Sequence, residues 1–387
     1  MSVTAARGFA ASGVQAGIRR AASDLALTRS LVRAVSGAVW TTNRVLAAPV
    51  VVSQRHLEVA EAQAIVVNSG IANAATGASG IEDAERTAAE AGELLGIEAD
   101  EVLVLSTGVI GIPLPMDRIL AGLQKAAAAL RPGGGDAAAT AILTTDQWPK
   151  QAQARTGTFT VGGMAKGAGM IHPCLATMLA VITTDYPLEP GEPVRFLRRA
   201  ADASFNRISV DGECSTNDAV VLLANGASGA RRSAALDDEF AAALDRVCRD
   251  LARMIVEDGE GSTVLLEIRV SGAATDEEAV AVARRVATSP LVKTAAFGRD
   301  PNWGRVLAAA GSAPWEEGFA RVDADRLTVA FDNTPVFERG APTGRVPPLN
   351  GAAMSIELDL GLGAGTAAYL ASDLTYDYVR INAEYTT

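Results

Sequence analysis

The sequence predicts a mixed α/β fold built in layers. Short apolar runs typical of strands alternate loosely with longer amphipathic runs of helical spacing, without a strict strand–helix–strand rhythm and without an internal repeat. Apolar residues make up 49% of the 387 residues and charged residues 20%, which is ample material for a buried core. A chain of this length predicts about two or three structural units.

In the N-terminal part, apolar and β-branched runs predict strands at Ser36–Trp40, Ala47–Ser53, Ala64–Asn68 and Val102–Ser106. Helical spacing of apolar residues predicts helices at Ile81–Leu95 and Met116–Leu130. The second helix is followed by RPGGGD at residues 131–136, whose proline and glycines break regular structure. This run is the one candidate domain boundary that composition indicates.

In the C-terminal part, similar runs predict strands at Thr158–Gly162, Leu179–Thr184, Val264–Val270, Arg326–Phe331 and Met354–Leu360. Amphipathic spacing predicts helices at Pro193–Ser204, Asp237–Val256 and Asp276–Thr288. The spacing of these elements favours mixed layers over a doubly wound nucleotide-binding sheet.

Charge and cysteine content narrow the class of function. The net charge is −11 and no cluster of Lys and Arg stands out, so a small-molecule enzyme is favoured over a nucleic-acid binder. The three cysteines show no CxxC spacing, which favours a reducing compartment. No signal-peptide pattern and no stretch of 18 apolar residues is seen, so we expect a cytoplasmic protein without a membrane segment.

The scarcity of histidine limits the chemistry. His56 is interpreted as a solvated surface residue, and a Ser-His-Asp triad would need His172, yet no GxSxG elbow is present. No zinc-ligand spacing and no phosphate-binding glycine loop occurs, so no metal is expected. A threonine at a chain's N-terminus needs no histidine, because its own α-amine, with a pKa of about 8, can act as the base.

One segment supplies such a threonine. KGAGMIHPCLATMLAVITTD, at residues 166–185, resembles the signature of the ornithine acetyltransferases, the bifunctional glutamate N-acetyltransferases of arginine biosynthesis. Further similar segments follow in the family's order over nearly the whole chain: NSG-ANA-TG (68–77), STGVIG (106–111), TTD with PK (144–150), SVDGE-STND (209–218), DGEG (258–261), SPLVKTA-FG-DPNWGR (289–305) and DLTYDYVRINAEYTT (373–387). The resemblance implies self-cleavage between Ala176 and Thr177.

The resemblance also implies roles for single residues. Thr177 is the implied nucleophile, and Thr107 with Gly108 is the implied oxyanion-stabilising pair. Without STGVIG around them, Thr107 and Gly108 would be a plain turn. The implied substrate-binding residues are Thr144 or Thr145, Lys166, Thr177, Glu260, Asn382 and the terminal Thr387. Outside its motif, Lys166 would be a solvated lysine and DGEG an acidic turn.

The implied fold is a self-processing α/β fold of the ornithine acetyltransferase/DmpA type with αββα layers and a smaller α/β C-terminal unit, roughly residues 270–387. Cleavage would give an α fragment, residues 1–176, and a β fragment, residues 177–387, which associate with each other and form an oligomer of fragment pairs. The implied substrates are small amino acids, with no nucleic acid, membrane or bound cofactor. Acetyl-CoA stays open as an alternative acetyl donor.

The implied reaction moves acetyl from N2-acetylornithine to glutamate through an acetyl ester on Thr177. Three departures from the family pattern leave the acyl acceptor open: Ile71, Cys174 and the run at residues 369–373. The alternatives are a paralogue that acts on another amino acid in secondary metabolism, a self-processing amidohydrolase or aminopeptidase of the same fold, and a binding protein without catalysis.

Overall fold

The computed structural model describes residues 3–172 and 178–384 of the chain. The chain divides into two compact units. The larger unit comprises the residues up to Asn206 together with Glu213–Ile255, and the smaller unit comprises Arg207–Gly212 and the residues from Val256 onward. Among the described residues, no helix combines the length and apolar character that a bilayer crossing requires.

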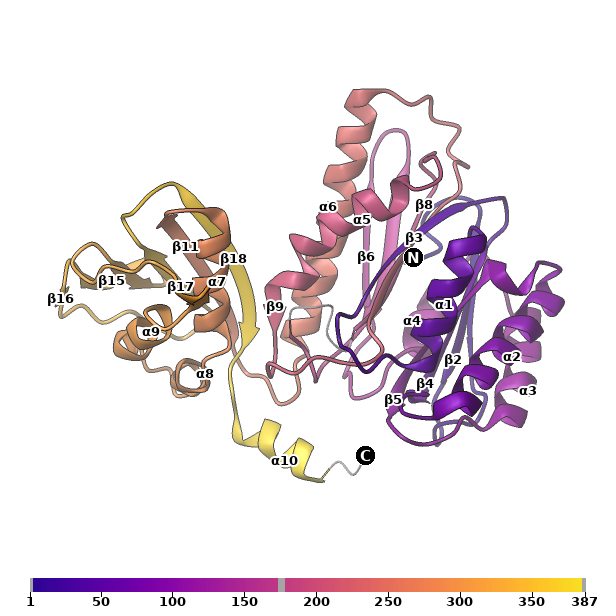
Figure 1. Ribbon diagram of the computed structural model, residues 1–387, viewed down its shortest axis with the longest axis horizontal. Coiled ribbons are helices and arrows are strands. Elements are labelled where there is room, and N and C mark those ends of the chain that lie inside the picture. The colour runs from indigo at the N-terminus through magenta and orange to yellow at the C-terminus, as the bar shows by residue number, and fades with distance from the viewer. Residues whose placement is uncertain (1–2, 173–177, 385–387) are drawn as a thin grey trace. The chain divides into compact units, whose positions relative to one another are not determined.

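The larger unit contains two β-sheets with helices around them (Figure 1). The first sheet has the order β1-β2-β4-β5, with β1 (Phe9–Val14), β2 (Leu25–Ser30), β4 (Ala64–Ile71) and β5 (Val102–Val109). The second has the order β3-β10-β8-β7-β6, with β3 (Val35–Trp40), β10 (Ala219–Ala224), β8 (Leu179–Thr184), β7 (Thr160–Lys166) and β6 (Lys150–Arg155). The helices are α1 (Ala48–Val59), α2 (Gly77–Leu95), α3 (Met116–Ala128), α4 (Gly135–Ala141), α5 (Glu192–Asp202) and α6 (Ala234–Glu257), with short 3₁₀ turns at Ala99–Glu101 and Phe205–Arg207.

The two sheets pack face to face over one apolar core. The side chains of Ile65 and Leu103 from the first sheet belong to the same buried cluster as Val181 and Val221 from the second. The opposite face of the first sheet is covered by α2 and α3, whose buried residues Ala88 and Leu123 join a second cluster. Alternate residues of β4 and β5 therefore face different cores, which explains why these two strands are largely apolar.

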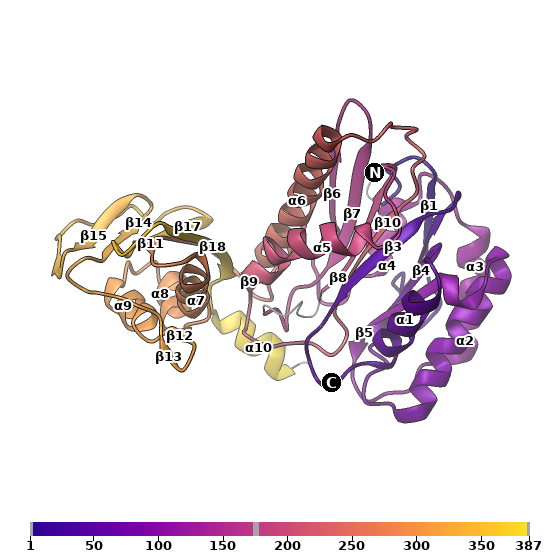
Figure 2. The same cartoon turned by 45° about the horizontal axis from the view of Figure 1, so that its top comes forward.

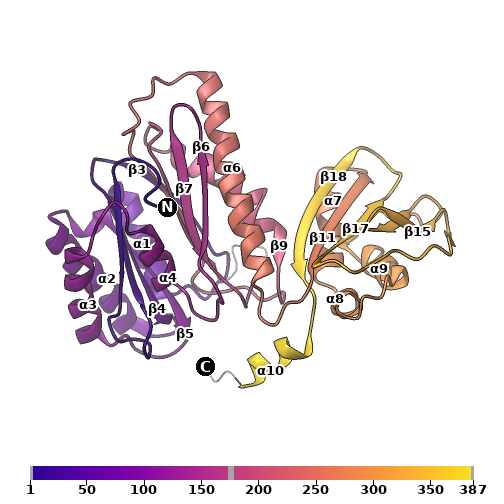
Figure 3. The same ribbon diagram turned by 180° about the vertical axis from the view of Figure 1, so that it is seen from behind.

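The outer face of the second sheet is covered by α5 and α6. Figure 3 shows α6 running beside β6 and β7. Gly163 on β7 faces this helix, because a Cβ built there would meet Leu251 at 3.0 Å and Val247 at 3.1 Å. The larger unit is thus a four-layer αββα arrangement, and the predicted layered fold is confirmed.

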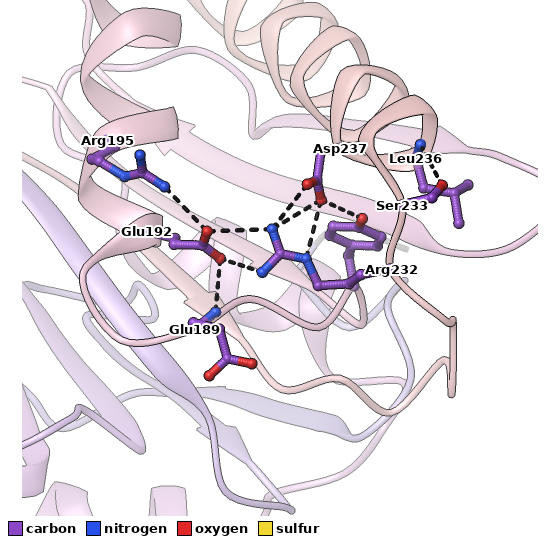
Figure 4. Close-up of polar contacts among 8 residues, drawn as sticks. Glu189, Glu192, Arg195, Arg232, Ser233, Leu236 and Asp237 are labelled. Carbon is purple, nitrogen blue, oxygen red and sulfur yellow. Dashed lines mark hydrogen bonds and ion pairs between the residues drawn. The ribbon is translucent and has the colours of Figure 1, made fainter.

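An ion network joins the starts of α5 and α6 (Figure 4). The Arg232 guanidinium donates to both carboxylate oxygens of Glu192 and of Asp237. Tyr186 donates its hydroxyl to Asp237 at 2.6 Å. Burial and the hydrogen bond to Asp237 raise the pKa of Tyr186 to about 12. The network fixes both helices against the sheet at the same end.

The smaller unit is a seven-stranded sheet with the order β16-β15-β14-β17-β11-β18-β9, and helices α7, α8 and α9 lie along it (Figure 2). Its strands are β9 (Ile208–Ser209), β11 (Leu265–Ala273), β14 (Thr328–Phe331), β15 (Thr334–Glu338), β16 (Ala341–Pro342), β17 (Ala353–Asp359) and β18 (Gly365–Ser372), with a separate hairpin of β12 (Pro314–Trp315) and β13 (Gly318–Phe319). Its helices are α7 (Asp276–Ala287), α8 (Pro290–Phe297), α9 (Trp303–Ala310) and α10 (Tyr376–Glu384). Thr275, Ser289 and Asn302 cap the first three helices, because each side chain accepts a hydrogen bond from a first-turn amide.

Two predictions near α1 are wrong. The valines of residues 47–53 predict a strand, but Ala48–Val59 is a helix with Ala47 as its N-cap and Pro49 in its first turn. Ser53 on this helix bonds both backbone groups of Val104 in β5, so packing against the sheet overrides β propensity. His56 is buried on the same face, and its Nδ1 lies 2.8 Å from the carbonyl oxygen of Val102. It is not the solvated residue that the sequence indicated.

The run at residues 131–136 is not a domain boundary. Arg131 and Ala11 exchange backbone hydrogen bonds of 3.0 and 3.2 Å, so the run is fastened to β1 inside the larger unit. Gly134 is required there because a Cβ would lie 1.7 Å from the carbonyl oxygen of Ala11. The breaker run is a tight packed turn.

Candidate active site

Two glycine-containing motifs meet at the end of the parallel strands β4 and β5. In the register of these strands, Ser69 pairs with Thr107 and Gly70 pairs with Gly108. The carboxyl ends of parallel strands are where ligands commonly bind in α/β sheets. The implied oxyanion pair, Thr107 and Gly108, therefore lies at a position suited to a site.

Both glycines adopt a backbone conformation that other residues avoid. The φ angle is +109° at Gly70 and +134° at Gly108. A Cβ on Gly108 would lie 2.2 Å from the carbonyl carbon of Gly70, so glycine at position 108 allows the two strand ends to approach this closely. A Cβ on Gly70 would instead meet the Arg19 side chain, with its Cγ at 2.7 Å.

The STND motif fastens the two strand ends. The side-chain amide of Asn217 donates to the carbonyl oxygens of Ser106, at 2.8 Å, and Ala72, at 2.7 Å. Ser106 donates its hydroxyl to Asn68 at 2.6 Å. Since these groups are buried, the network fixes Ser106, the residue before Thr107, to Asn68 and Ala72 at the end of the neighbouring strand.

The implied cleavage site, Ala176 and Thr177, lies outside the described residues. Met178 and strand β8, which follow it, are described. The amide of Met178 donates to the buried carboxylate of Asp218 at 3.0 Å. Leu179, the first residue of β8, pairs with Lys166 at the end of β7. The residue after Thr177 and the implied substrate lysine are therefore fixed by the same sheet.

Lys166 belongs to a buried cluster around Asp146. The Asp146 carboxylate accepts hydrogen bonds from Lys150 Nζ at 2.7 Å and from the Gly167 amide at 2.6 Å, and Lys166 Nζ lies 3.9 Å away. Thr144 donates its amide to the same carboxylate at 3.0 Å. The structure thus brings Thr144 and Lys166 together, and Asp146 is the group that joins them.

Asp146 is ionised in this cluster. Burial alone would raise the pKa of Asp146, but the charges of Lys166 and Lys150 and the Gly167 hydrogen bond outweigh it, and the pKa lies well below its usual value. The carboxylate is thus held as an ion beside two lysines. Sequence reasoning quoted TTD and PK as motifs but gave Asp146 and Lys150 no role.

Arg19 connects Gly70, at the end of β4, with the segment that contains Thr144. Its guanidinium donates to the carbonyl oxygens of Leu143, at 2.5 Å, and Thr144, at 3.1 Å. The stem of the same side chain lies against Gly70, where an added Cβ would meet Arg19 Cγ at 2.7 Å. Thr145 is half-buried beside this segment.

Glu260 and Asn382 lie together in the smaller unit. The side-chain amide of Asn382 donates to Glu260 Oε2 at 2.9 Å. Glu260 is half-buried and Asn382 exposed, so this carboxylate can accept further donors from solvent or from a ligand. The implied contact Thr387 lies outside the described residues.

Other kinds of site are not indicated. Among the described side chains, no group of three or more His, Cys, Asp or Glu is placed to hold a metal ion. A cavity of about 290 Å³ in the larger unit is lined by Ala38, Val39, Trp40, Thr42, Arg198, Asp202 and Asn206, none of which belongs to the motifs of the site.

Comparison with known proteins shows the family of the chain. The family model described as "ArgJ family" matches residues 10–387. The arginine biosynthesis bifunctional protein ArgJ of Symbiobacterium thermophilum is 48% identical over 397 residues, covering 100% of this chain and 98% of that protein. The ArgJ protein of Geobacter sulfurreducens is 45% identical over 399 residues, covering 98% of this chain and 99% of that protein.

A solved structure is also similar in sequence. Ornithine acetyltransferase from Mycobacterium tuberculosis, crystallised with ornithine, is 45% identical, covers 44% of this chain and 94% of its own chain, and has a TM-score of 0.43. The family match and the full-length relatives decide the assignment: the chain belongs to the ArgJ family of arginine-biosynthesis acyltransferases.

Proposed function

We propose that the chain transfers acetyl from N2-acetylornithine to glutamate through an acetyl ester on Thr177, after cleaving itself between Ala176 and Thr177. The products are ornithine and N-acetylglutamate. The observation that carries the proposal is the match to ArgJ proteins along the chain.

Self-cleavage would create the catalytic group. The Thr177 hydroxyl attacks the Ala176 carbonyl, the amide becomes an ester, and water hydrolyses that ester. One carboxylate then ends the first fragment, and Thr177 begins the second with a free α-amine. This amine supplies the base that the two histidines of the chain do not provide at a recognisable motif.

Acetyl transfer then follows in two half-reactions. The α-amine takes the proton of the Thr177 hydroxyl as its oxygen attacks the acetyl group, and returns a proton to the departing amine of ornithine. The amine of glutamate next attacks the ester, and the threonine oxygen leaves with its proton restored. The Thr107 hydroxyl and the Gly108 amide would stabilise the negative oxygen in both steps, and loss of one such donor typically costs about 3–4 kcal/mol.

Charge supports the binding of amino acids. The Lys166 ammonium suits a substrate α-carboxylate, and the Glu260 carboxylate suits an ammonium group. Donor and acceptor share an α-amino-acid core, so one set of residues can serve both half-reactions.

Intact mass and activity of the purified full chain test the proposal. We expect two fragments, one from Met1 to Ala176 and one beginning at Thr177, and transfer of acetyl from N2-acetylornithine to glutamate. Thr177→Ala should remain one inactive chain, while Thr177→Ser keeps a hydroxyl and should still be cleaved. Release of free acetate without N-acetylglutamate would indicate a hydrolase instead, and an active uncleaved chain would refute the mechanism.

The same assay addresses the second donor. Acetyl-CoA would form the same acetyl-Thr177 ester without a bound cofactor. Production of N-acetylglutamate from acetyl-CoA and glutamate, abolished in Thr177→Ala, is the result that would establish this activity.

A further inference from the structure

The loop that carries Glu260 is fastened to a distant part of the chain. This loop, DGEG at residues 258–261, joins α6 to β11. Gly261 has a φ of +66°, and a Cβ there would lie 2.5 Å from the backbone nitrogen of Tyr378. The loop therefore packs directly against the segment that follows β18, which contains Asp373 and Asn382.

Asp373 makes most of the polar connection. Its carboxylate accepts hydrogen bonds from the Thr263 amide at 2.9 Å, the Thr263 hydroxyl at 2.5 Å and the Ser262 hydroxyl at 3.4 Å. Its own amide donates to the Val264 carbonyl oxygen at 3.1 Å. Asp373 is only 3% exposed, so these bonds are what compensate the burial of its charge.

Lys293 holds Asp373 from the other side. Its ammonium donates to the carbonyl and hydroxyl oxygens of Ser372, and its carbonyl accepts the Leu374 amide at 3.3 Å. Both neighbours of Asp373 are thus bound to one buried lysine on α8. Lys293 therefore fixes the backbone on both sides of Asp373, independently of the bonds that Asp373 makes to the loop.

Two more bonds reach the loop beyond Asp373. Thr375 donates its hydroxyl to the Gly261 carbonyl oxygen at 2.8 Å, and Asn382 donates to the Glu260 carboxylate at 2.9 Å. Glu260 therefore lies between the C-terminal end of α6 and residues 261–263, to which Asp373 and Thr375 are hydrogen-bonded.

We propose that Asp373, supported by Lys293, is a positioning residue that sets the Glu260 carboxylate for the ammonium group of the substrate. This inference rests on the proposed function, in which Glu260 binds substrate. Asp373 itself does not contact the Glu260 side chain, so it acts through the backbone of residues 261–263. A misplaced carboxylate weakens binding of the substrate more than it slows the chemical step.

Steady-state kinetics of the cleaved full-length enzyme test it. Asp373→Asn keeps the shape but presents an amide where Thr263 donates, and we expect kcat/KM for N2-acetylornithine to fall about 10- to 100-fold, mainly through KM. Thr263→Val removes one donor from an exposed position and should shift KM in the same direction, while Thr263→Ser keeps the hydroxyl and should resemble the wild type. A merely structural role would lower the folded fraction, and hence kcat, without changing KM.

A double-mutant cycle with Glu260→Gln separates the possible failures. If Asp373 works through Glu260, the double variant should be little worse than Glu260→Gln alone. If the losses of kcat/KM in the two single variants multiply fully in the double variant, the role of Asp373 is overturned while Glu260 remains a ligand. An unchanged KM in Glu260→Gln would overturn both assignments, and a wild type without acetyl transfer would refute the proposed function itself.

Discussion

Gly108 is a residue at which the neighbouring backbone leaves no room for a side chain. An alanine there places its Cβ 2.2 Å from Gly70 C and 2.5 Å from the Ile71 nitrogen, and these are backbone atoms that cannot rotate away. The positive φ adds strain of about 1–2 kcal/mol. We expect Gly108→Ala to lower the free energy of unfolding by about 3–5 kcal/mol, measured by denaturant titration.

Gly111 in the same motif is the matched control. Its φ is also positive, at +82°, but a Cβ there meets nothing within 4 Å. Gly111→Ala should therefore lose only the strain of about 1–2 kcal/mol. Equal losses in the two variants would show that close packing of the strand ends is not what selects glycine at position 108.

Lys293 should make stability depend on alkaline pH. Burial lowers its pKa to about 8 from 10.5, although Asp373 and Asp211 oppose the shift. Between pH 8 and pH 10.5 the unfolded chain binds more protons than the folded chain. The free energy of unfolding therefore rises with pH through this window and falls as the pH is lowered toward 8. The difference between the two pKa values of Lys293 corresponds to about 3 kcal/mol in the free energy of unfolding.

Unfolding measured from pH 8 to 10.5 for the wild type and Lys293→Met tests this linkage. Methionine has similar length and no charge, so other titrations cancel in the difference between the two curves. The wild type should gain stability relative to the variant as pH rises. Parallel curves would mean that Lys293 titrates normally in the folded protein.

At the scale of elements, the Arg232 network should stabilise the ends of α5 and α6. The Arg232 side chain is 26% exposed and bridges two carboxylates, so its replacement removes the arginine partner of Asp237 and leaves Glu192 paired with Arg195. We expect Arg232→Met to cost about 2–3 kcal/mol, observed as a lower Tm. Arg195 contacts the same Glu192 but is 70% exposed, and Arg195→Met should cost less than about 1 kcal/mol. Similar losses in both variants would contradict the importance of burial.

Elements were predictable from sequence where local pattern and tertiary packing agree. Leu179–Thr184 was predicted with the bounds that β8 has, because all six of its residues are apolar or β-branched and all are buried. Helix α1 was missed because its valines favour a strand locally, while its packing on β5 is decided by residues far along the chain.

The sequence could name the motifs of the candidate site, but not the residues that hold these motifs in place. Family motifs named Thr107, Gly108 and Lys166, yet nothing in them assigned roles to Asp146, Asn217 or Asp373. Their roles come from bonds across long separations, such as 111 residues from Asn217 to Ser106 and 110 from Asp373 to Thr263. A local pattern cannot encode such contacts, so only the folded chain reveals which polar residues hold the motifs in place.

At the scale of the whole molecule, the implied fragments 1–176 and 177–387 share one sheet. Strands β8 and β10 follow the proposed cleavage point, and they lie between β3 and β7, which precede it. The core between the sheets is mixed in the same way, since Met164 and Leu103 pack in one cluster with Leu179 and Val221. Neither fragment has the complete second sheet or the complete core between the two sheets.

Cleavage should therefore leave the fragments inseparable without denaturation. Separating them would break the β10–β3 and β8–β7 ladders and expose the core, at about 25 cal/mol for each Å² of apolar surface uncovered. We expect both fragments to co-elute in native size-exclusion chromatography at low protein concentration and in 1 M salt, since apolar burial is not weakened by screening. They should separate only in denaturant, together with the loss of secondary structure followed by circular dichroism. Elution of fragment 1–176 alone and folded under native conditions would refute the interleaved arrangement, because loss of β8 and β10 opens the second sheet and the core between the two sheets.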